Sequence, residues 1–288
     1  MRSTESWPLV SCRPEGSQVT DKAEPRDRGF LFDTSVPHVA RVYDYWLGGR
    51  NNFAADRAAA ERVIAMYPGV RAGVRAQRAF LGRVVHYLAA EAGIRQFLDI
   101  GTGLPAGDNT HEVAQRAAPE SRIVYVDNDP IVLLHARSLL KSSREGATAF
   151  VDADLRDTGT IMAEAARTLD LGKPVAVLLL GILHCIPDAE NPAAIVRGLL
   201  AAVPAGSYLA LTHIASDVAE DATRSMREFG NWGAPPVTPR THAQVSHFFE
   251  GLDLVPPGLV QTIRWRPAAD GPGTDRVEPN YGGVARKP

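Results

Sequence analysis

Apolar residues recur at helical spacing in the first third of the chain. The first such segment predicts a short helix that begins near Ser35 and stops at a pair of glycines, with an apolar face of Val39, Val42, Tyr43, Trp46 and Leu47. Two further helices are expected at residues 53–66 and 71–90. Residues 34–93 are therefore predicted to form a helical extension.

Beyond residue 93 the pattern changes to short apolar runs that alternate with helical stretches. The runs predict strands at residues 96–100, 122–126, 147–151, 175–180 and 207–214. Alternation of this kind is typical of an α/β fold with a mainly parallel sheet and helices on both faces. We expect residues 94–288 to hold this sheet and to form one structural unit with the extension at 34–93, after a weakly ordered tail at residues 1–33.

Composition allows one large domain with additions, because 45% of the 288 residues are hydrophobic. The net charge of −2 and the even spread of basic residues do not indicate binding to nucleic acid or to a membrane. Cys12 and Cys185 fit neither a disulfide framework nor a zinc site, and the histidines show no metal-ligand spacing, so no metal is predicted. With no signal-peptide core and no apolar run long enough to span a bilayer, we expect a soluble, cytoplasmic protein.

A glycine turn follows the first predicted strand, in the sequence Phe97-Leu98-Asp99-Ile100-Gly101-Thr102-Gly103-Leu104-Pro105. With Ala106, the two glycines match the dinucleotide pattern G-x-G-x-x-G/A, which is typical of NAD(P)-dependent oxidoreductases. Asp99 and Asp108 flank the turn, with no Lys or Arg between them. These charges oppose a pyrophosphate and favour a cationic ammonium group. S-adenosylmethionine fits this preference, since it carries an ammonium and a sulfonium and no phosphate.

The ends of the later strands carry further polar motifs. Asp127 follows the second strand, Asp154 follows the third, and Leu183-His184-Cys185-Ile186-Pro187-Asp188 follows the fourth. In this order the motifs resemble those of class I S-adenosylmethionine-dependent methyltransferases.

Two longer signatures narrow this resemblance. Pro37-His38-Val39-Ala40-Arg41-Val42-Tyr43-Asp44-Tyr45-Trp46-Leu47-Gly48-Gly49 and the ending Tyr281-Gly282-Gly283-Val284-Ala285-Arg286-Lys287 are similar to those of a bacterial S-adenosyl methyltransferase family long catalogued as a domain of unknown function. The resemblance covers residues 35–288. It implies a Rossmann-like, seven-stranded sheet whose last strand is antiparallel, with S-adenosylmethionine as methyl donor. It defines no methyl acceptor.

The resemblance also implies residues for the methionine part of the cofactor. Gly101 and Gly103 let the backbone approach this part, and Asp99 lies near its ammonium group. Thr102 and Gly181 belong to the same predicted cofactor-binding set. The alternative is a tight turn that serves only strand-to-helix packing.

For the nucleoside part, Asp127 is expected to bind the ribose, with Asn128 beside it. Asp154 and Leu155 are expected to face the adenine, with Asp154 accepting a hydrogen bond from the exocyclic amine. Asp152 takes this role if the third strand ends earlier. The alternative for Asp127 is a helix cap, and either of the later acids can be an ordinary turn residue.

His184 and Asp188 are the candidate catalytic residues, because they follow the fourth strand, where the methyl group should face the acceptor. A general base there helps if the acceptor is a hydroxyl or a protonated amine. A structural, hydrogen-bonded histidine is the competing interpretation. Positioning alone can also drive an in-line displacement. His213 is a weaker candidate for the acceptor site.

The aromatic residues Tyr43, Tyr45 and Trp46 are predicted to roof the cofactor or acceptor pocket. Only some of these rings can share one helical face, and the competing account for all of them is helix packing. Arg41, Asn51 and Asn52 are expected to support the same lid.

The leading functional hypothesis is therefore a methyltransferase that uses S-adenosylmethionine and acts on a small organic acceptor. A non-catalytic protein that senses S-adenosylmethionine is a second possibility, because methyl transfer has no obligatory catalytic residue to look for. An NAD(P)-dependent oxidoreductase is the third, and it would require a pyrophosphate to tolerate Asp99 and Asp108.

Overall fold

The computed structural model describes residues 33–139, 141–232, 236–267 and 277–288 of the chain. The predicted tail at residues 1–33 lies outside these ranges, apart from Asp33. Residues 32–288 form one compact unit, which holds both the helical extension and the sheet. Within the described residues, no helix is long and apolar enough to cross a membrane.

The described residues form one sheet of eight strands, in the order β3-β2-β1-β4-β5-β8-β6, with β7 also paired to β8. The strands are β1 (Gln96–Ile100), β2 (Arg122–Asp127), β3 (Ala147–Asp152), β4 (Ala176–Leu180), β5 (Tyr208–Ile214), β6 (Asp253–Leu254), β7 (Val260–Gln261) and β8 (Asn280–Arg286). β1 to β5 pair in parallel, and β8 runs antiparallel to β5. The predicted α/β fold with an antiparallel last strand is confirmed, and the short β7 is added to a path of seven strands.

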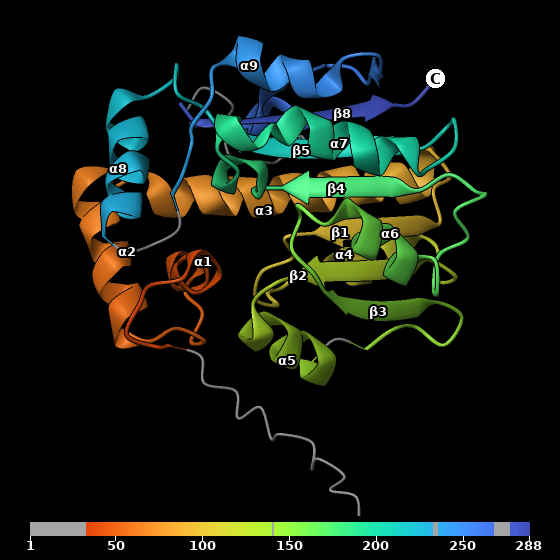
Figure 1. Ribbon diagram of the computed structural model, residues 1–288, viewed down its shortest axis with the longest axis horizontal. Helices are drawn as coiled ribbons and strands as arrows, with labels where there is room; N and C mark the ends of the chain where they lie inside the picture. Colours follow the sequence, from red (N-terminus) through yellow and green to blue (C-terminus); the bar gives the residue numbers. More distant parts are fainter. Residues whose placement is uncertain (1–32, 140, 233–235, 268–276) are drawn as a thin grey trace, which may run out of the picture. The chain divides into compact units, whose positions relative to one another are not determined.

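Helices cover both faces of this sheet, as predicted (Figure 1). The described helices after β1 are α4 (Thr110–Ala117), α5 (Pro130–Leu139), α6 (Thr158–Ala165), α7 (Pro192–Ala201), α8 (Glu220–Asn231) and α9 (His242–Ser246). One core joins alternate strand residues to α6, α7 and α9, and the other joins the residues between them to α3 (Val70–His86) and α4. Residues of β1 and β4 therefore pack on both faces, which explains their continuous apolar runs.

The helical extension consists of α1 (Val39–Leu47), α2 (Ala54–Met66) and α3 (Val70–His86), and a π-helical turn continues α3 at Tyr87–Glu91. α1 and α2 share a core with α8, built around Val42, Trp46, Met226 and Phe229. Figure 1 shows β2 and β4 pointing toward α1, α2 and α8, whereas β8 points the opposite way. α1 and α2 thus stand at the carboxyl ends of the parallel strands, whereas α3 packs on one face of the sheet.

A buried carboxylate, that of Asp56, determines where α1 begins. It accepts hydrogen bonds from the backbone N–H of His38 at 2.9 Å and from Arg41 Nε at 3.0 Å. The helix therefore starts at Val39 with His38 as its N-cap, three residues later than the Ser35 cap predicted from the sequence. The end of the helix is as predicted, with Gly48 in the left-handed region at φ 89°.

The loop after α1 is held by Asp44. One carboxylate oxygen of this residue accepts hydrogen bonds from the backbone N–H of Asn51 and the side chain of Asn52. A side chain at Gly49 would collide with the same carboxylate. Arg41, Asn51 and Asn52 therefore support the extension from within, through contacts to Asp56 and Asp44, and do not line the pocket.

Candidate functional site

A pocket of about 440 Å³ lies at the carboxyl ends of β1, β2 and β4, where the strand order reverses. We divide it into two halves. The glycine half is formed by the strand ends and the residues that contact them, mainly Asp99–Gly103, Val126–Asn128, Ala153–Arg156, Leu180–Ile182, His38, Arg78 and Glu190. The helical half is formed by α1, α3, α8 and the segments that follow β4 and β5, mainly Val39, Val42, Tyr43, Trp46, Val70, Val74, Gln77, His184, Cys185, Ile214, Met226, Phe229 and Val237.

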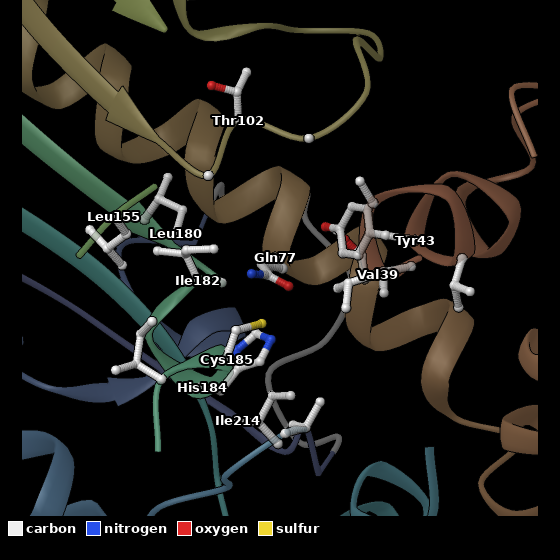
Figure 2. A pocket seen from close by; sticks show the side chains of 18 of the residues that line it. Val39, Tyr43, Gln77, Thr102, Leu155, Leu180, Ile182, His184, Cys185 and Ile214 are labelled. Carbon is white, nitrogen blue, oxygen red and sulfur yellow. Dashed lines mark hydrogen bonds between the residues drawn. The ribbon is translucent and has the colours of Figure 1, made fainter. Parts of the chain in front are cut away.

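Figure 2 shows how these halves face each other. Leu155, Leu180 and Ile182 stand on one side of the cavity, and Tyr43 and Val39 stand across from them. Gln77 lies between the two groups, with His184 and Cys185 near it. All the cofactor-binding residues predicted from the sequence line this one pocket.

The glycine turn after β1 has the backbone that the sequence indicated. Gly101 and Gly103 both have positive φ, at 75° and 66°. A side chain on Gly101 would come within 2.8 Å of Ile182, whereas one on Gly103 would meet no atom within 4 Å. Gly101 is therefore required for packing against the segment after β4, and Gly103 leaves open space at the pocket.

Asp127 ties the end of β2 to the turn. Its Oδ2 accepts a hydrogen bond from the backbone N–H of Gly103 at 2.9 Å, and its Oδ1 accepts one from the N–H of Asp129 at 3.0 Å. Burial raises the pKa of this carboxyl, and the two backbone donors work against the increase. Asp129 in turn contacts His38 Nδ1 at 3.0 Å, which links this loop to the start of α1.

Asp99 is buried at the end of β1. Its Oδ2 accepts a hydrogen bond of 2.6 Å from Thr110 Oγ1. Burial raises the pKa of Asp99 to about 6, although Thr110 and the nearby Arg78 guanidinium favour the charged form. A cation that binds beside Asp99 would lower this pKa and favour the ionised carboxylate.

Arg78 is a pocket residue that sequence reasoning missed. It comes from α3, and its Nη2 donates to the carbonyl of Gly107 at 3.0 Å. Its Nε is buried and has no hydrogen-bond partner in the described structure. The two acidic flanks predicted for the turn therefore differ: Asp99 lies in the pocket beside a cation, whereas Asp108 is exposed and pairs with Arg116 at 3.2 Å.

The end of β3 distinguishes Asp154 from Asp152. Asp154 lines the pocket, where it accepts hydrogen bonds from Asn128 Nδ2 at 3.0 Å and from the backbone N–H of Arg156 at 2.9 Å. Leu155 is buried beside it. Asp152 is the last residue of β3, is exposed and does not belong to the lining. Of the two alternatives, only Asp154 lines the pocket.

The predicted lid residues separate around α1. Tyr43 and Trp46 line the pocket, and the Tyr43 hydroxyl donates to the carbonyl of Val74 at 3.1 Å. Tyr45 faces away, where its hydroxyl donates to Glu61 and Arg71 lies over its ring. As expected, the three rings do not share one helical face, because Tyr43 and Trp46 line the pocket and Tyr45 does not.

His184 and Asp188 also separate. His184 is buried, lines the pocket and has an Nδ1 with no partner among the described residues. Asp188 lies outside the lining and accepts hydrogen bonds from Arg240 Nε and Nη2 at 2.9 and 2.7 Å. Arg240 also donates to the carbonyls of Leu183 and Ile186, so the ion pair fixes the loop that carries His184.

His213 belongs to the same fixed network. Its Nδ1 donates to the carbonyl of Ile214 at 2.9 Å, which leaves Nε2 to accept from Arg240 Nη1 at 2.8 Å. Burial lowers the pKa of His213 to about 3 and that of His184 to about 4. Both rings are neutral near pH 7, and only His184 reaches the pocket.

Comparison with known proteins agrees with this geometry. A model of the S-adenosyl methyltransferase family matches residues 26–288. A crystal structure of a DUF574 family protein from Streptomyces avermitilis is 46% identical, covers 89% of this chain and 99% of its own, and superposes with a TM-score of 0.86. A candidate methyltransferase from Thermobifida fusca is 37% identical, covers 88% of this chain and 96% of its own, and has a TM-score of 0.81. None of the curated proteins matches the chain.

Proposed function

The chain belongs to the S-adenosyl methyltransferase family, whose cofactor is S-adenosylmethionine, and we propose on this basis that it transfers the cofactor's methyl group to a small organic acceptor. The observation that supports the proposal is the continuity of the pocket. Its glycine half carries the acidic residues and positive-φ glycines, and its helical half offers adjoining apolar space. A cofactor and an acceptor can therefore meet in one cavity.

The glycine half fits the charges of the methionine part. This part is a zwitterion, with one ammonium and one carboxylate. The carboxylate of Asp99 would pair with the ammonium group. The buried, unpartnered Nε of Arg78 would donate a hydrogen bond to the carboxylate of the cofactor. The close approach of this acid and this base suits a zwitterion better than it suits a pyrophosphate.

The strand ends fit the nucleoside part. Asp127 would accept hydrogen bonds from the ribose hydroxyls, since its carboxylate is already oriented by the N–H groups of Gly103 and Asp129. Asp154 would accept from the exocyclic amine of adenine, with Leu155 against the ring. Asn128, which donates to Asp154, would hold that carboxylate in place.

When bound, S-adenosylmethionine supplies a methyl group on a positively charged sulfur. The protein's contribution is to bind, orient and exclude water, which suits an in-line displacement. Tyr43 and Trp46 close the pocket from α1, and Arg240 and Asp188 hold the loop that presents His184. Asp188 is therefore proposed as a positioning residue, and His184 as the one that touches the acceptor.

Binding separates this proposal from a nucleotide-dependent oxidoreductase. Isothermal titration calorimetry with S-adenosylhomocysteine, the demethylated product, should give saturable binding with one site per chain. NADH should neither bind nor compete. Tight NADH binding that displaces S-adenosylhomocysteine would overturn the proposal.

Turnover separates an enzyme from a sensor of S-adenosylmethionine. Incubation with S-adenosylmethionine and a panel of small acceptors should release S-adenosylhomocysteine in an acceptor-dependent way, measured by mass spectrometry. We place this reaction in the cytoplasm, because the two widely spaced cysteines suit a reducing compartment. A protein that binds the cofactor but releases product with none of the acceptors would be the sensor.

A further inference from the structure

The charged groups of the pocket gather in its glycine half. Asp154, Arg156 and Glu190 form a chain of ion pairs there, and Arg78 and Asp99 lie at the turn. In the described part of the helical half, the lining includes no Asp, Glu, Lys or Arg. A ligand that enters the helical half therefore meets no counter-charge.

Glu278 is a buried acid behind this wall, where its Oε1 would lie 3.4 Å from a side chain at the lining residue Gly73. It lies outside the lining, and its carboxylate accepts hydrogen bonds from Thr262 Oγ1 at 2.5 Å and from Asn280. Burial raises the pKa of Glu278 to about 7. Since both oxygens are occupied and burial disfavours the charge, Glu278 does not provide a partner for a cationic ligand.

The walls of the helical half are rings and branched side chains. Tyr43 and Trp46 come from α1, and Phe229 comes from α8. The rings of Trp46 and Phe229 lie 6.4 Å apart at an angle of 50°. Surfaces of this kind favour a ligand with a flat, apolar body.

Two polar side chains interrupt this apolar lining, those of Gln77 and His184. Gln77 Nε2 donates to Thr212 Oγ1 at 2.9 Å, whereas His184 carries the one buried side-chain N or O atom without a hydrogen-bond partner among the residues named above for the helical half. His184 is 7% exposed, and its Nδ1 is buried with no hydrogen-bond partner in the described structure. The ring is held in place by an edge-to-face contact with His213 at 6.0 Å and by the bond from Thr238 N–H to the His184 carbonyl at 2.7 Å. An unpaired buried acceptor is costly, and a bound hydroxyl would satisfy it.

We propose that the helical half binds an uncharged acceptor with a flat apolar body and directs its aromatic hydroxyl group onto Nδ1 of His184. This inference rests on the proposed function and names the class of acceptor that the same pocket takes. An aliphatic amine is a cation at neutral pH and a carboxylic acid is an anion, so either would be desolvated without a partner. A phenol is neutral and donates one hydrogen bond.

The hydroxyl proton has a defined destination in this arrangement. The hydroxyl oxygen bonds to the methyl carbon as the carbon–sulfur bond breaks and leaves its electron pair on sulfur, and the proton passes from oxygen to Nδ1 of His184. This requires the tautomer with its proton on Nε2. A weak base is sufficient, because the oxygen becomes strongly acidic once it bonds to the methyl group. The imidazolium then releases the proton to solvent.

The test compares ligands that share one ring system. The probes are 2-naphthol, naphthalene, 2-naphthoate and 2-(aminomethyl)naphthalene, titrated at pH 7.5 into protein saturated with S-adenosylhomocysteine. We expect 2-naphthol to bind at least about tenfold tighter than the anion and the cation. With S-adenosylmethionine in place of the product, 2-naphthol should be converted to 2-methoxynaphthalene. Absence of 2-naphthol binding, or tighter binding of a charged probe, overturns the inference.

A variant isolates the role of His184. His184→Phe keeps a ring and removes Nδ1, so the preference for 2-naphthol over naphthalene should fall about tenfold. His247→Phe is the matched control, because it makes the same substitution at an exposed histidine outside the lining, and it should keep the preference. His184→Gln serves if His184→Phe does not fold. An unchanged preference in the folded His184 variant overturns the inference.

The same experiment keeps the two proposals apart. S-adenosylhomocysteine binding by the wild-type protein reports on the glycine half alone, before any probe is added. Loss of that binding contradicts the proposed function. Retained binding with the wrong probe preference contradicts only the acceptor class.

Discussion

The two halves of the pocket are built in different ways. The glycine half uses short segments that each follow one strand, such as the turn at Gly101 and the carboxylate of Asp127. The helical half draws single residues from α1, α3, α8 and the segments after β4 and β5. The first is a local sequence feature repeated at neighbouring strand ends, and the second exists only after the chain folds. The proposed donor site is therefore far easier to identify from sequence than the proposed acceptor site.

The largest effect expected within the glycine half is that of Gly101→Ala. The substitution combines a positive φ with a 2.8 Å approach to Ile182, so it should lower the free energy of unfolding by about 3 kcal/mol. Gly103→Ala, which has open space around it, should cost about 1 kcal/mol. Urea denaturation measures both values. Equal losses would show that Ile182 does not restrict the turn.

Arg78→Met should have the next largest effect, on binding of the methionine part. Loss of a charge-assisted hydrogen bond to the carboxylate should weaken S-adenosylhomocysteine binding by about tenfold or more. Methylthioadenosine lacks the amino acid group, and its affinity should not change. Because Arg78 also holds the loop at Gly107, the ratio of the two affinities is the decisive quantity. Equal weakening of both ligands would assign Arg78 a purely structural role.

The residues of the glycine half also show which features the sequence could predict and which it could not. The strands and the residues at their ends were predictable, because buried parallel strands are continuous apolar runs and the acids follow them directly. β1 has the predicted boundaries, and β2 and β3 each extend one residue further. Arg78 was not predictable, because the helical pattern does not distinguish it from the other arginines of α3. Only the fold brings it to the turn.

The acceptor side shows the same limit of local patterns. His184 and Asp188 share one loop, but only His184 lines the pocket. Asp188 instead forms an ion pair with Arg240, which lies 52 residues further along the chain. α9 starts only at His242, because Arg240 forms a bridge to Ala215, directly after β5. Contacts between distant segments therefore decide which side chains face the acceptor.

A pH dependence should follow from Asp99. Its pKa is raised to about 6 in the folded protein, so its carboxylate becomes available to the ligand's ammonium as the pH rises through 6. Affinity for S-adenosylhomocysteine should increase by up to about tenfold from pH 5 to pH 7 and then level off. Asp99→Asn should flatten this profile. Calorimetry across the range measures it, and a wild-type affinity that falls with pH would contradict the role of Asp99.

Without ligand the same shift acts on stability with the opposite sign. A carboxyl whose pKa lies above its ordinary value of 3.8 favours the protonated folded state. The contribution of Asp99 to stability should therefore decline as the pH rises from about 4 to 6. Urea denaturation of the wild type and Asp99→Asn over this range isolates that contribution, and a difference that does not vary with pH would contradict it.

The smallest effect is expected at Tyr45. Its ring faces Glu61 and Arg71 outside the pocket, so Tyr45→Ala should change the affinity for 2-naphthol by less than about twofold. Tyr43→Ala, two residues earlier and inside the pocket, should weaken it by about tenfold. Fluorescence titration compares the two. A larger effect at Tyr45 would reverse the assignment of the faces of α1.

The proposed cofactor site lies at the carboxyl ends of β1, β2 and β3, with Asp127 on the ribose. Calorimetry with S-adenosylhomocysteine on the wild type, Asp127→Ala and Asp152→Ala tests this site directly. These two carboxylates are paired in register on β2 and β3, but only Asp127 lines the pocket. Binding should be at least about tenfold weaker for Asp127→Ala and unchanged for Asp152→Ala. Equal affinities for Asp127→Ala and the wild type would contradict it.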